Sequence, residues 1–584
     1  MHGESSGDLS AGEVRQQTRW APSCPVLDRP SFCQVPATLH FSTRMHRPMG
    51  SNSITFRHPA AFWLGCLLVM AGVAAHLPML WMSRYMHWQM AGMGMSPGMW
   101  FGMAMIPLGL GFSAFGLMPR RERRAAAQAP AIPGFHVTDD VPLNRAHWAL
   151  VAALVVALAV DVMKPATLGF VMPGLSAEYA ISHASASLLA LVALTGTTVG
   201  SVVWGRMGDV LGRRAAILLS ALMFIGTAIC GAMPSFGWNL VMCFLMGASA
   251  GGLLPIAFTL MAETVPAAHR GWLLVALGGV GTSAGYLLAS GAAAVLEPMF
   301  SWRILWLLGL PTGAAIILLN HWIPESPRFL SGAGLHEQAR AVLQRFSGPR
   351  ANAIAVDPPA AGAGDALDQR HPVTGLRQLL QGRQARISWG LLLCGTGWGV
   401  ANFGFVLWLP TNLVELGVDP HAASALLARS ALWALPGIAV VVWLYHRWSS
   451  VRALVLFIAL TCVALLAFAA MSWLQVRSAA WTMACTAALL VAISGVIAML
   501  IPYAAEIYPL HLRATGAGVI AASSKFGGIL GAGLGVLGLM GHLAWSAVLI
   551  AVPLAMSAVM LLRAGVETRG QRLEQIQQAL RLED

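Results

Sequence analysis

Residues 205–214 read GRMGDVLGRR, a short polar stretch between two long apolar runs. Glycine permits a tight turn and lets two helices approach closely. The acid at position 209 can cap the start of a helix and pair with an arginine. We therefore predict a loop that latches two helices in one conformation and releases them in another. The alternative is a plain loop whose arginines only orient the chain in a membrane. The expected latch residues are Gly205, Asp209, Gly212, Arg213 and Arg214.

The composition around this loop excludes a soluble domain. Of the 584 residues, 57% are hydrophobic and 10% are charged, whereas soluble domains carry about 25% charged residues. A membrane-spanning helix needs about 20 apolar residues. Such runs predict two leading spans, at 59–79 and 97–118, and twelve more, at 146–173, 185–205, 215–233, 238–262, 272–296, 302–322, 387–412, 422–445, 453–475, 479–505, 514–539 and 543–562.

The breaks between these runs predict an all-α polytopic membrane protein, with two six-helix halves after an extra N-terminal two-helix hairpin. The expected segments are a disordered tail at 1–58, an accessory hairpin at 59–118, a basic linker at 119–145, the first half at 146–330, a central loop at 331–386, the second half at 387–562 and a C-terminal tail at 563–584. An alternative for the first residues is a translated upstream extension, with the true start at Met45 or Met49.

Basic residues test this layout, because cytoplasmic loops are enriched in lysine and arginine. Most of the 36 lysines and arginines fall in alternate loops and in the C-terminal tail, while the outer loops hold only Arg84, Arg303 and Arg477. One missed span would invert every later loop, so this bias supports the count. It predicts a multi-pass protein of the plasma (inner) membrane with both termini in the cytoplasm. It also accounts for the net charge of +12 without a nucleic-acid partner.

A second motif, E-x-x-P-x-x-x-R, occurs once in each half, after the fourth and the tenth of the twelve spans. Internal repeats underlie alternating access in secondary transporters. We expect the two acids to pair with cytoplasmic arginines when an inner gate is closed. The alternative is helix capping without gating. The residues of the two copies are Glu263, Pro266 and Arg270, and Glu506, Pro509 and Arg513.

Residues 205–214 resemble the signature loop G-x-x-x-D-x-x-G-R-R of the major facilitator superfamily. PESPRFL at 324–330 and ETRGQRLEQI at 567–576 are similar to motifs of its sugar-porter branch and of related organic-ion transporters. DVMKPATLGFVMP at 161–173 resembles the aromatic-acid:proton symporter pattern D-G-x-D-x-x-x-x-G-x-x-x-P. The resemblance implies the 12-helix major facilitator fold and secondary active transport by alternating access.

This chain departs from those patterns at several positions. Lys164 replaces the second acid of the aromatic-acid pattern, and Val162 replaces its glycine. Cys243 stands where relatives often carry an arginine. Sugar porters place glutamines in spans five and seven, whereas span five here has none and span seven offers only Asn402. A sugar is therefore a weaker expectation than an organic anion.

Charged residues inside spans are costly and usually functional. The only two lysines, Lys164 and Lys525, lie in spans one and eleven, Arg429 lies in span eight, and Asp161 is the only acid well inside a span. The resemblance places all of these spans around the transport cavity. We expect Lys525 and Arg429 to hold a carboxylate. Asp161 lies three residues before Lys164 and shares its helix face.

The Asp161–Lys164 pair suggests a coupling mechanism. Protonation of Asp161 would free Lys164 to bind the substrate anion, which would couple proton and cargo. In the alternative, Asp161 and Lys164 merely neutralise each other and Arg429 extends outward to the membrane surface. Aromatic side chains on the same spans could stack on a planar substrate or simply pack. These are Trp398, Phe403, Trp408 and Trp433, and Trp398 and Asn402 join the expected substrate site.

The expected function is proton-coupled transport of a small aromatic or aliphatic carboxylate by a monomer that contacts membrane lipid. We expect no enzyme, cofactor or metal, because no catalytic triad, phosphate loop or metal-ligand spacing is present. Alternatives are a drug exporter, a sugar transporter or a non-transporting receptor of the same fold. Nine of the 29 methionines lie between Met79 and Met105. Thioethers suit Cu(I), which leaves a copper importer as a further alternative, although methionine also fills apolar helices freely.

Overall fold

The structure is a computed structural model that describes residues 58–118, 141–181, 183–333, 335–347, 379, 382–406, 436–437, 439–475, 478–536 and 543–581. Those residues form helices and no strand. All but the last residue of the expected tail at 1–58, most of the basic linker and much of the central loop lie outside this part. Arg429, Trp408 and Trp433 also lie outside the described residues.

Each half is built from long apolar helices. The helices of the first half are α5 (Arg145–Tyr179), α6 (His183–Leu211), α7 (Arg213–Gly226) with a 3-10 extension (Thr227–Ala232), α8 (Phe236–Thr264), α9 (Ala267–Phe300), α10 (Ile304–Leu307) and α11 (Gly309–Leu319). Those of the second half are α15 (Gly382–Gly399) with a π-helical extension (Val400–Val406), α18 (Ser450–Trp473), α19 (Ala479–Ile507), α20 (Arg513–Val536) and α21 (Leu543–Ala564). Helical residues 439–447 precede α18.

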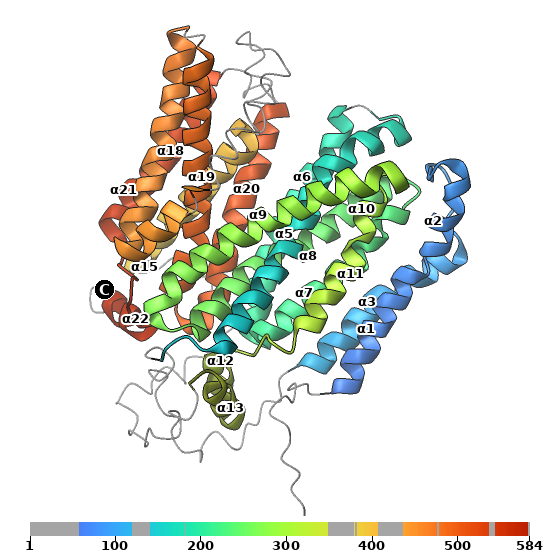
Figure 1. The fold of residues 1–584 in the computed structure, drawn as a ribbon, viewed down its shortest axis with the longest axis horizontal. Helices are drawn as coiled ribbons and strands as arrows, with labels where there is room; N and C mark the ends of the chain where they lie inside the picture. Colours follow the sequence, from blue (N-terminus) through green and yellow to red (C-terminus); the bar gives the residue numbers. More distant parts are fainter. Residues whose placement is uncertain are drawn as a thin grey trace, which may run out of the picture. The chain divides into compact units, whose positions relative to one another are not determined.

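Three short helices lie at one end of the long ones, together with the C-terminus (Figure 1). They are α12 (Pro327–Gly332), α13 (His336–Ser347) and α22 (Leu573–Arg581). We call this end of the molecule the α22 end. The expected short amphipathic helix after Arg563 corresponds to α22.

Eleven helices of the described residues are long and apolar enough to cross a membrane. They correspond to eleven of the fourteen runs expected from the sequence. The run at 272–296 lies within α9, and the run at 302–322 corresponds to the shorter apolar helix Ile304–Leu319. Most of the run at 422–445 lies outside the described residues. The expected all-α polytopic fold is confirmed.

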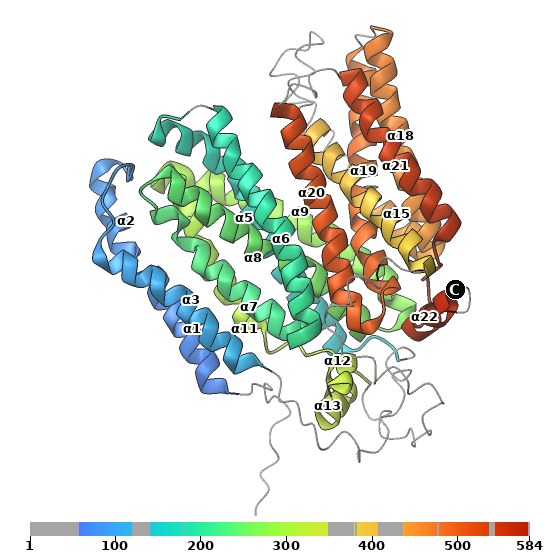
Figure 2. The same cartoon turned by 180° about the vertical axis from the view of Figure 1, so that it is seen from behind.

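The two halves meet where α6 lies beside α20, near the α22 end (Figure 2). Gly205 is needed there, because a Cβ at this position would lie 2.6 Å from the carbonyl oxygen of Ala514. Small residues let helix backbones approach closely where no water drives association. Gly205 lies inside α6, which continues to Leu211, so this glycine serves contact between the halves and makes no turn. The expected loop at 205–214 is shorter than predicted, because only Gly212 separates α6 from α7.

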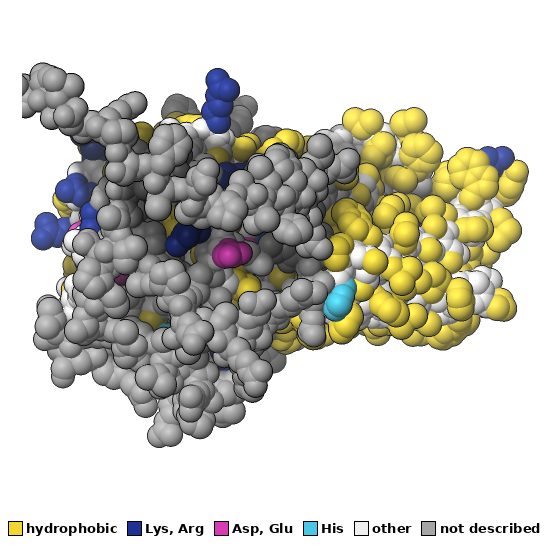
Figure 3. All heavy atoms as spheres, turned by 90° about the horizontal axis from the view of Figure 1, so that it is seen from below, with side chains coloured by type: hydrophobic (Ala, Val, Ile, Leu, Met, Phe, Trp, Pro, Cys, Tyr) yellow, Lys and Arg dark blue, Asp and Glu magenta, His cyan; other side chains and the backbone are white. Residues whose placement is uncertain are grey.

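The leading hairpin consists of α1 (Pro59–Ala74), α2 (Leu77–Ser83) and α3 (Pro97–Leu117). It packs on α7 of the first half, where Ile106 and Val69 approach Gly226. Hydrophobic side chains cover this part of the molecule as seen from the α22 end (Figure 3). Leu67 and Phe101 are among its exposed residues. Such a surface suits lipid rather than water.

Candidate functional site

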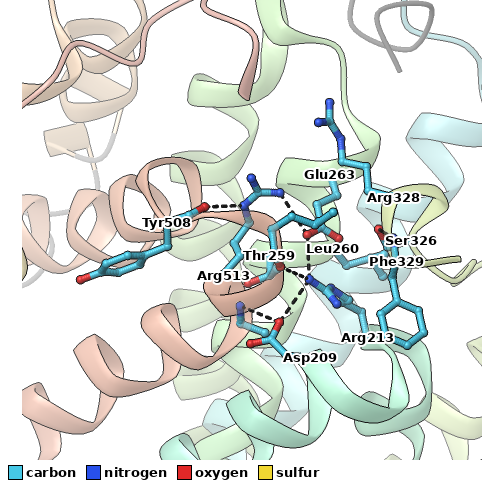
Figure 4. Close-up of polar contacts among 12 residues, drawn as sticks. Asp209, Arg213, Thr259, Leu260, Glu263, Ser326, Arg328, Phe329, Tyr508 and Arg513 are labelled. Carbon is cyan, nitrogen blue, oxygen red and sulfur yellow. Dashed lines mark hydrogen bonds and ion pairs between the residues drawn. The ribbon is translucent and has the colours of Figure 1, made fainter. Parts of the chain in front are cut away.

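A buried carboxylate joins the two halves at the α22 end. Oε1 of Glu263, near the end of α8, lies 3.0 Å from an Arg213 nitrogen and 3.1 Å from an Arg513 nitrogen. Arg213 begins α7 of the first half, and Arg513 begins α20 of the second half. All three side chains are at most 2% exposed (Figure 4). One buried acid thus pairs with an arginine from each half.

Asp209 makes a second connection, from the end of α6 to the start of α20. Its carboxylate accepts hydrogen bonds from the backbone N–H of Ala514 (3.2 Å), the N–H of Thr515 (2.7 Å) and the Thr515 hydroxyl (2.6 Å). These amides are the unpaired donors of a helix start, which an anion satisfies. Asp209 also pairs with Arg213 at 3.2 Å. The expected helix cap is present, and the helix that it caps belongs to the other half.

The remaining latch residues fix the start of α7. Gly212 adopts φ = 110°, a backbone conformation that residues other than glycine rarely adopt. The guanidinium of Arg214 donates to Asn320 Oδ1 at 2.7 Å within the first half. Arg213 also donates to the carbonyl oxygen of Leu510 in the second half, at 3.1 Å. Arg213 therefore contacts both halves, whereas Arg214 binds Asn320 within the first half.

The second copy of the E-x-x-P-x-x-x-R motif has different partners. Glu506, near the end of α19, accepts hydrogen bonds from the Tyr445 hydroxyl (3.0 Å) and the Thr568 hydroxyl (2.6 Å). The charge of Arg270, from the first half, also acts on this carboxylate. Pro266 and Pro509 each precede the helical turn that follows their acid, at the starts of α9 and of Leu510–Leu512.

Two further acids were not assigned a role from the sequence, although the motifs at 324–330 and 567–576 contain them. Glu325 accepts from the backbone N–H of Arg213 at 2.7 Å, at the start of α7. Glu567 accepts from the backbone N–H and hydroxyl of Ser450, at 3.0 and 2.7 Å, at the start of α18. Burial raises the pKa of Glu325, whereas hydrogen bonds from Ser449 and Ser450 lower the pKa of Glu567. Each acid thus caps the third helix of its half.

Lys164 does not pair with Asp161 in this structure, which corrects the expectation from their spacing. Its ammonium group donates to the carbonyl oxygen of Phe224 (2.9 Å) and to the hydroxyl of Thr227 (2.7 Å), and it lies 4.3 Å from the centre of the Phe224 ring. The side chain is fully buried. A lysine side chain is long enough to leave its own helix face, and here it runs from α5 to the end of α7.

Asp161 and Lys525 instead act on each other across the halves. Asp161 belongs to α5 and Lys525 belongs to α20, and the two opposite charges attract each other electrostatically. Asp161 is 6% exposed, whereas Lys525 is partly buried. The ammonium group of Lys525 lies 5.7 Å from the ring centre of Phe403. Within the described residues, Asp161 and Lys525 are thus opposite charges that lie in membrane spans of different halves and interact electrostatically.

The residues of span seven divide into packing and candidate contact residues. Trp398 donates its indole N–H to the carbonyl oxygen of Ile493 at 2.9 Å and is 7% exposed, so its polar group is already used in holding α15 to α19. Phe403 packs edge-on against Trp398 and faces Lys525. Asn402 is partly buried in the π-helical turn Val400–Val406 beside α20. Such π-helical turns are frequent at functional sites.

Known proteins share both the sequence and the fold. The chain is 28% identical to the niacin transporter NiaP of Acinetobacter baylyi, over 75% of this chain and 98% of NiaP. It is 24% identical to the 4-hydroxybenzoate transporter PcaK of the same organism, over 76% of this chain and 97% of PcaK.

Among solved structures, the proton:xylose symporter XylE bound to 6-bromo-6-deoxy-D-glucose matches with a TM-score of 0.62. It is 14% identical, and the match covers 74% of this chain and 99% of that one. The human organic anion transporter MFSD10 matches with a TM-score of 0.52, at 16% identity, over 71% of this chain and 99% of that one. These matches show the fold. The model of the Major Facilitator Superfamily matches residues 149–532. This range contains the latch and most of the two halves, from α5 to α20, and the chain belongs to this superfamily.

Proposed function

We propose that this protein is a proton-coupled transporter of a small organic anion that bears a carboxylate on an aromatic ring. The names of two relatives support this substrate class, since niacin and 4-hydroxybenzoate are both aromatic carboxylates. An ammonium group is a suitable partner for a carboxylate in a site of low dielectric constant. Lys525 supplies that group from α20, with the ring of Phe403 beside it.

The proposal is supported by the placement of two opposite charges, Asp161 on α5 of the first half and Lys525 on α20 of the second half, which act electrostatically on each other. When Asp161 is ionised, its negative charge compensates the positive charge of Lys525, and a substrate anion gains little binding energy from Lys525. Protonation of Asp161 removes that compensation, and the ammonium group then favours the substrate carboxylate. Release of the proton would restore the original pair and expel the anion. Proton and substrate would then move together.

The closed α22 end supports alternating access. Glu263 and Asp209 hold the start of α20 against the first half, so this end opens only when buried ion pairs break. Separating a buried ion pair is costly, because it leaves a buried charge without its partner. We assign the α22 end to the cytoplasmic side of the inner membrane, since the loops there carry most of the basic residues. The conformation would then be closed toward the cytoplasm.

Uptake in proteoliposomes tests the substrate class. Purified full-length protein would be offered a panel of aromatic carboxylates, their neutral amides and xylose, with and without an inward proton gradient. We expect uptake of at least one carboxylate and none of its amide. Lys525→Met should reduce that uptake by about tenfold or more, corresponding to loss of about 1.4 kcal/mol or more of substrate stabilisation, and Lys525→Arg should retain part of it.

The control for charge removal is Arg452→Gln, at an exposed position at the start of α18. This variant should transport like the wild-type protein. If Lys525→Met takes up every carboxylate as fast as the wild type, the anion site is elsewhere and the proposal fails. Uptake of the amides or of xylose at the carboxylate rate would refute the substrate class.

A further inference from the structure

The leading hairpin holds a buried histidine with only one ring nitrogen in a hydrogen bond. His76 lies just before α2 and is 1% exposed. Its Nδ1 lies 2.8 Å from the carbonyl oxygen of Gly72, one turn back in the chain. A carbonyl oxygen can only accept, so Nδ1 carries the proton and Nε2 carries a lone pair. That Nε2 is buried and has no hydrogen-bond partner among the described residues.

An unsatisfied buried acceptor costs about 1–3 kcal/mol, so the arrangement needs a reason. Histidines that bind metal ions have this same arrangement. They donate one ring N–H to a backbone carbonyl, which fixes the tautomer and turns the other nitrogen toward the ion. The Gly72 carbonyl gives His76 that orientation.

Two buried methionines lie one helical turn from positions that place the ring. The ring faces α3, where its Cε1 would lie 3.0 Å from a Cβ at Gly102. Met99 lies one turn before Gly102 on α3 and is fully buried, and Met79 lies one turn after His76 on α2 and is 4% exposed. Residues three apart share a helix face. Met79 therefore lies on the same side of α2 as His76, and Met99 lies on the same face of α3 as Gly102, which the imidazole approaches.

These donors select the ion. Thioether and imidazole ligands suit Cu(I), whereas zinc and hard cations prefer sets of histidine, cysteine and carboxylate. The described residues contain no group of three such side chains placed to hold a metal ion. We propose that Nε2 of His76, with the thioethers of Met79 and Met99, forms a Cu(I) site inside the hairpin.

The site is separate from the proposed path of the organic anion. The hairpin packs against α7 of the first half. Asp161 and Lys525, by contrast, belong to α5 and α20 and interact across the two halves. The ion would thus be resident and not cargo. Failure of either proposal leaves the other standing.

Competition with bicinchoninate under reducing, anaerobic conditions tests the site on the full-length protein in detergent. We expect the wild type to retain about one Cu(I) per chain. Removal of a ligand should weaken binding more than the roughly 10- to 100-fold that loss of an outer-shell partner costs. The ligand variants are His76→Phe and the volume-conserving Met99→Leu, which is well tolerated in a packed core. X-ray absorption of the loaded wild type should show sulfur neighbours together with a nitrogen neighbour.

Two matched controls lie in the same segment at exposed positions, His87→Phe and Met86→Leu. Both should bind Cu(I) like the wild type. The proposal is overturned if the wild type retains no Cu(I), if His76→Phe and Met99→Leu retain it as well as the controls, or if the absorption spectrum shows no sulfur neighbour. The last measurement needs no substitution, so it stands even if a variant fails to fold.

Discussion

Glu263 and Arg513 are joined by a 3.1 Å ion pair between α8 of the first half and α20 of the second half. The same carboxylate oxygen also binds Arg213 of its own half at 3.0 Å. Removing this acid would leave two buried guanidinium groups without their shared counter-charge. Because the contact crosses the halves, its loss should act on the conformational equilibrium as well as on folding.

Glu263→Gln should open the α22 end. Loss of one partner of a buried ion pair costs about 3–5 kcal/mol, and here the cost falls on the closed state. Spin labels at Ala268 and Arg452, exposed positions at the starts of α9 and α18, should move apart in double electron–electron resonance. Glu337→Gln, at an exposed position on α13, is the control. An unchanged distance distribution in Glu263→Gln would show that this pair does not hold the end closed.

Thr515→Val should weaken the Asp209 cap without removing a charge. The hydroxyl of Thr515 donates to Asp209 at 2.6 Å, and valine has nearly the same shape. Hydrogen bonds to charged groups contribute about 1.5–3 kcal/mol. The labels at Ala268 and Arg452 should report a shift toward the open state that is smaller than the shift in Glu263→Gln. If the distance between the labels shifts as much as in Glu263→Gln, loss of this one hydrogen bond does not account for the effect of the Thr515 hydroxyl.

Glu178→Gln should loosen the loop of the hairpin. Glu178 pairs with the buried Arg303 at 2.5 Å, and it accepts from the backbone N–H groups of Met90 (2.6 Å) and Ala91 (3.1 Å). A neutral amide accepts more weakly from both partners. Amide hydrogen exchange should accelerate at residues 90 and 91 and stay unchanged at the α6–α20 contact. Equal exchange in both proteins would show that the hairpin is held elsewhere.

The two helix-capping acids outside the spans should give opposite dependences on pH. Burial raises the pKa of Glu325 above its ordinary value of 4.5. Its contribution to stability is therefore present below pH 4.5 and is lost as pH rises through the raised pKa. Hydrogen bonds lower the pKa of Glu567 below 4.5. Its contribution to stability is therefore present above pH 4.5 and is lost as pH falls through the lowered pKa. Thermal unfolding followed across pH measures both.

The wild-type protein should lose stability as the pH rises above 4.5 because Glu325 ionises, and Glu325→Gln should not show this loss. Glu567→Gln should instead be less stable than the wild type at neutral pH. Glutamine retains an acceptor oxygen for the capped N–H groups, so each change isolates the charge. The same pH profile in both variants would contradict the opposite shifts.

The sequence predicted the parts of this structure that depend on local pattern. Apolar runs predicted the helices, and the spacing of the GRMGDVLGRR loop predicted a cap and an arginine partner for Asp209. The Glu263 motif predicted a contact with arginines, and Arg213 and Arg513 make it, whereas the role of this contact as an inner gate stays a prediction. These features follow from residues that lie close together in the chain or in a known motif.

The sequence did not predict contacts between distant segments. Helix spacing placed Asp161 and Lys164 on one face, but it says nothing of a long side chain that bends toward α7. The influence of Lys525 on Asp161 depends on how α20 packs against the first half, which no local pattern encodes. Glu325 and Glu567 belong to quoted motifs, yet their capping role appears only once α7 and α18 are placed.

Transport by Asp161→Asn tests the central claim most directly, because the variant keeps the shape of the side chain and removes its titration. The measurement compares proton-driven accumulation of the carboxylate in proteoliposomes with exchange of the carboxylate at equal concentration on both sides. If Asp161 carries the proton that releases Lys525, the variant exchanges substrate and does not accumulate it in response to a proton gradient. Accumulation by Asp161→Asn at the wild-type level and with the wild-type pH dependence would contradict the account.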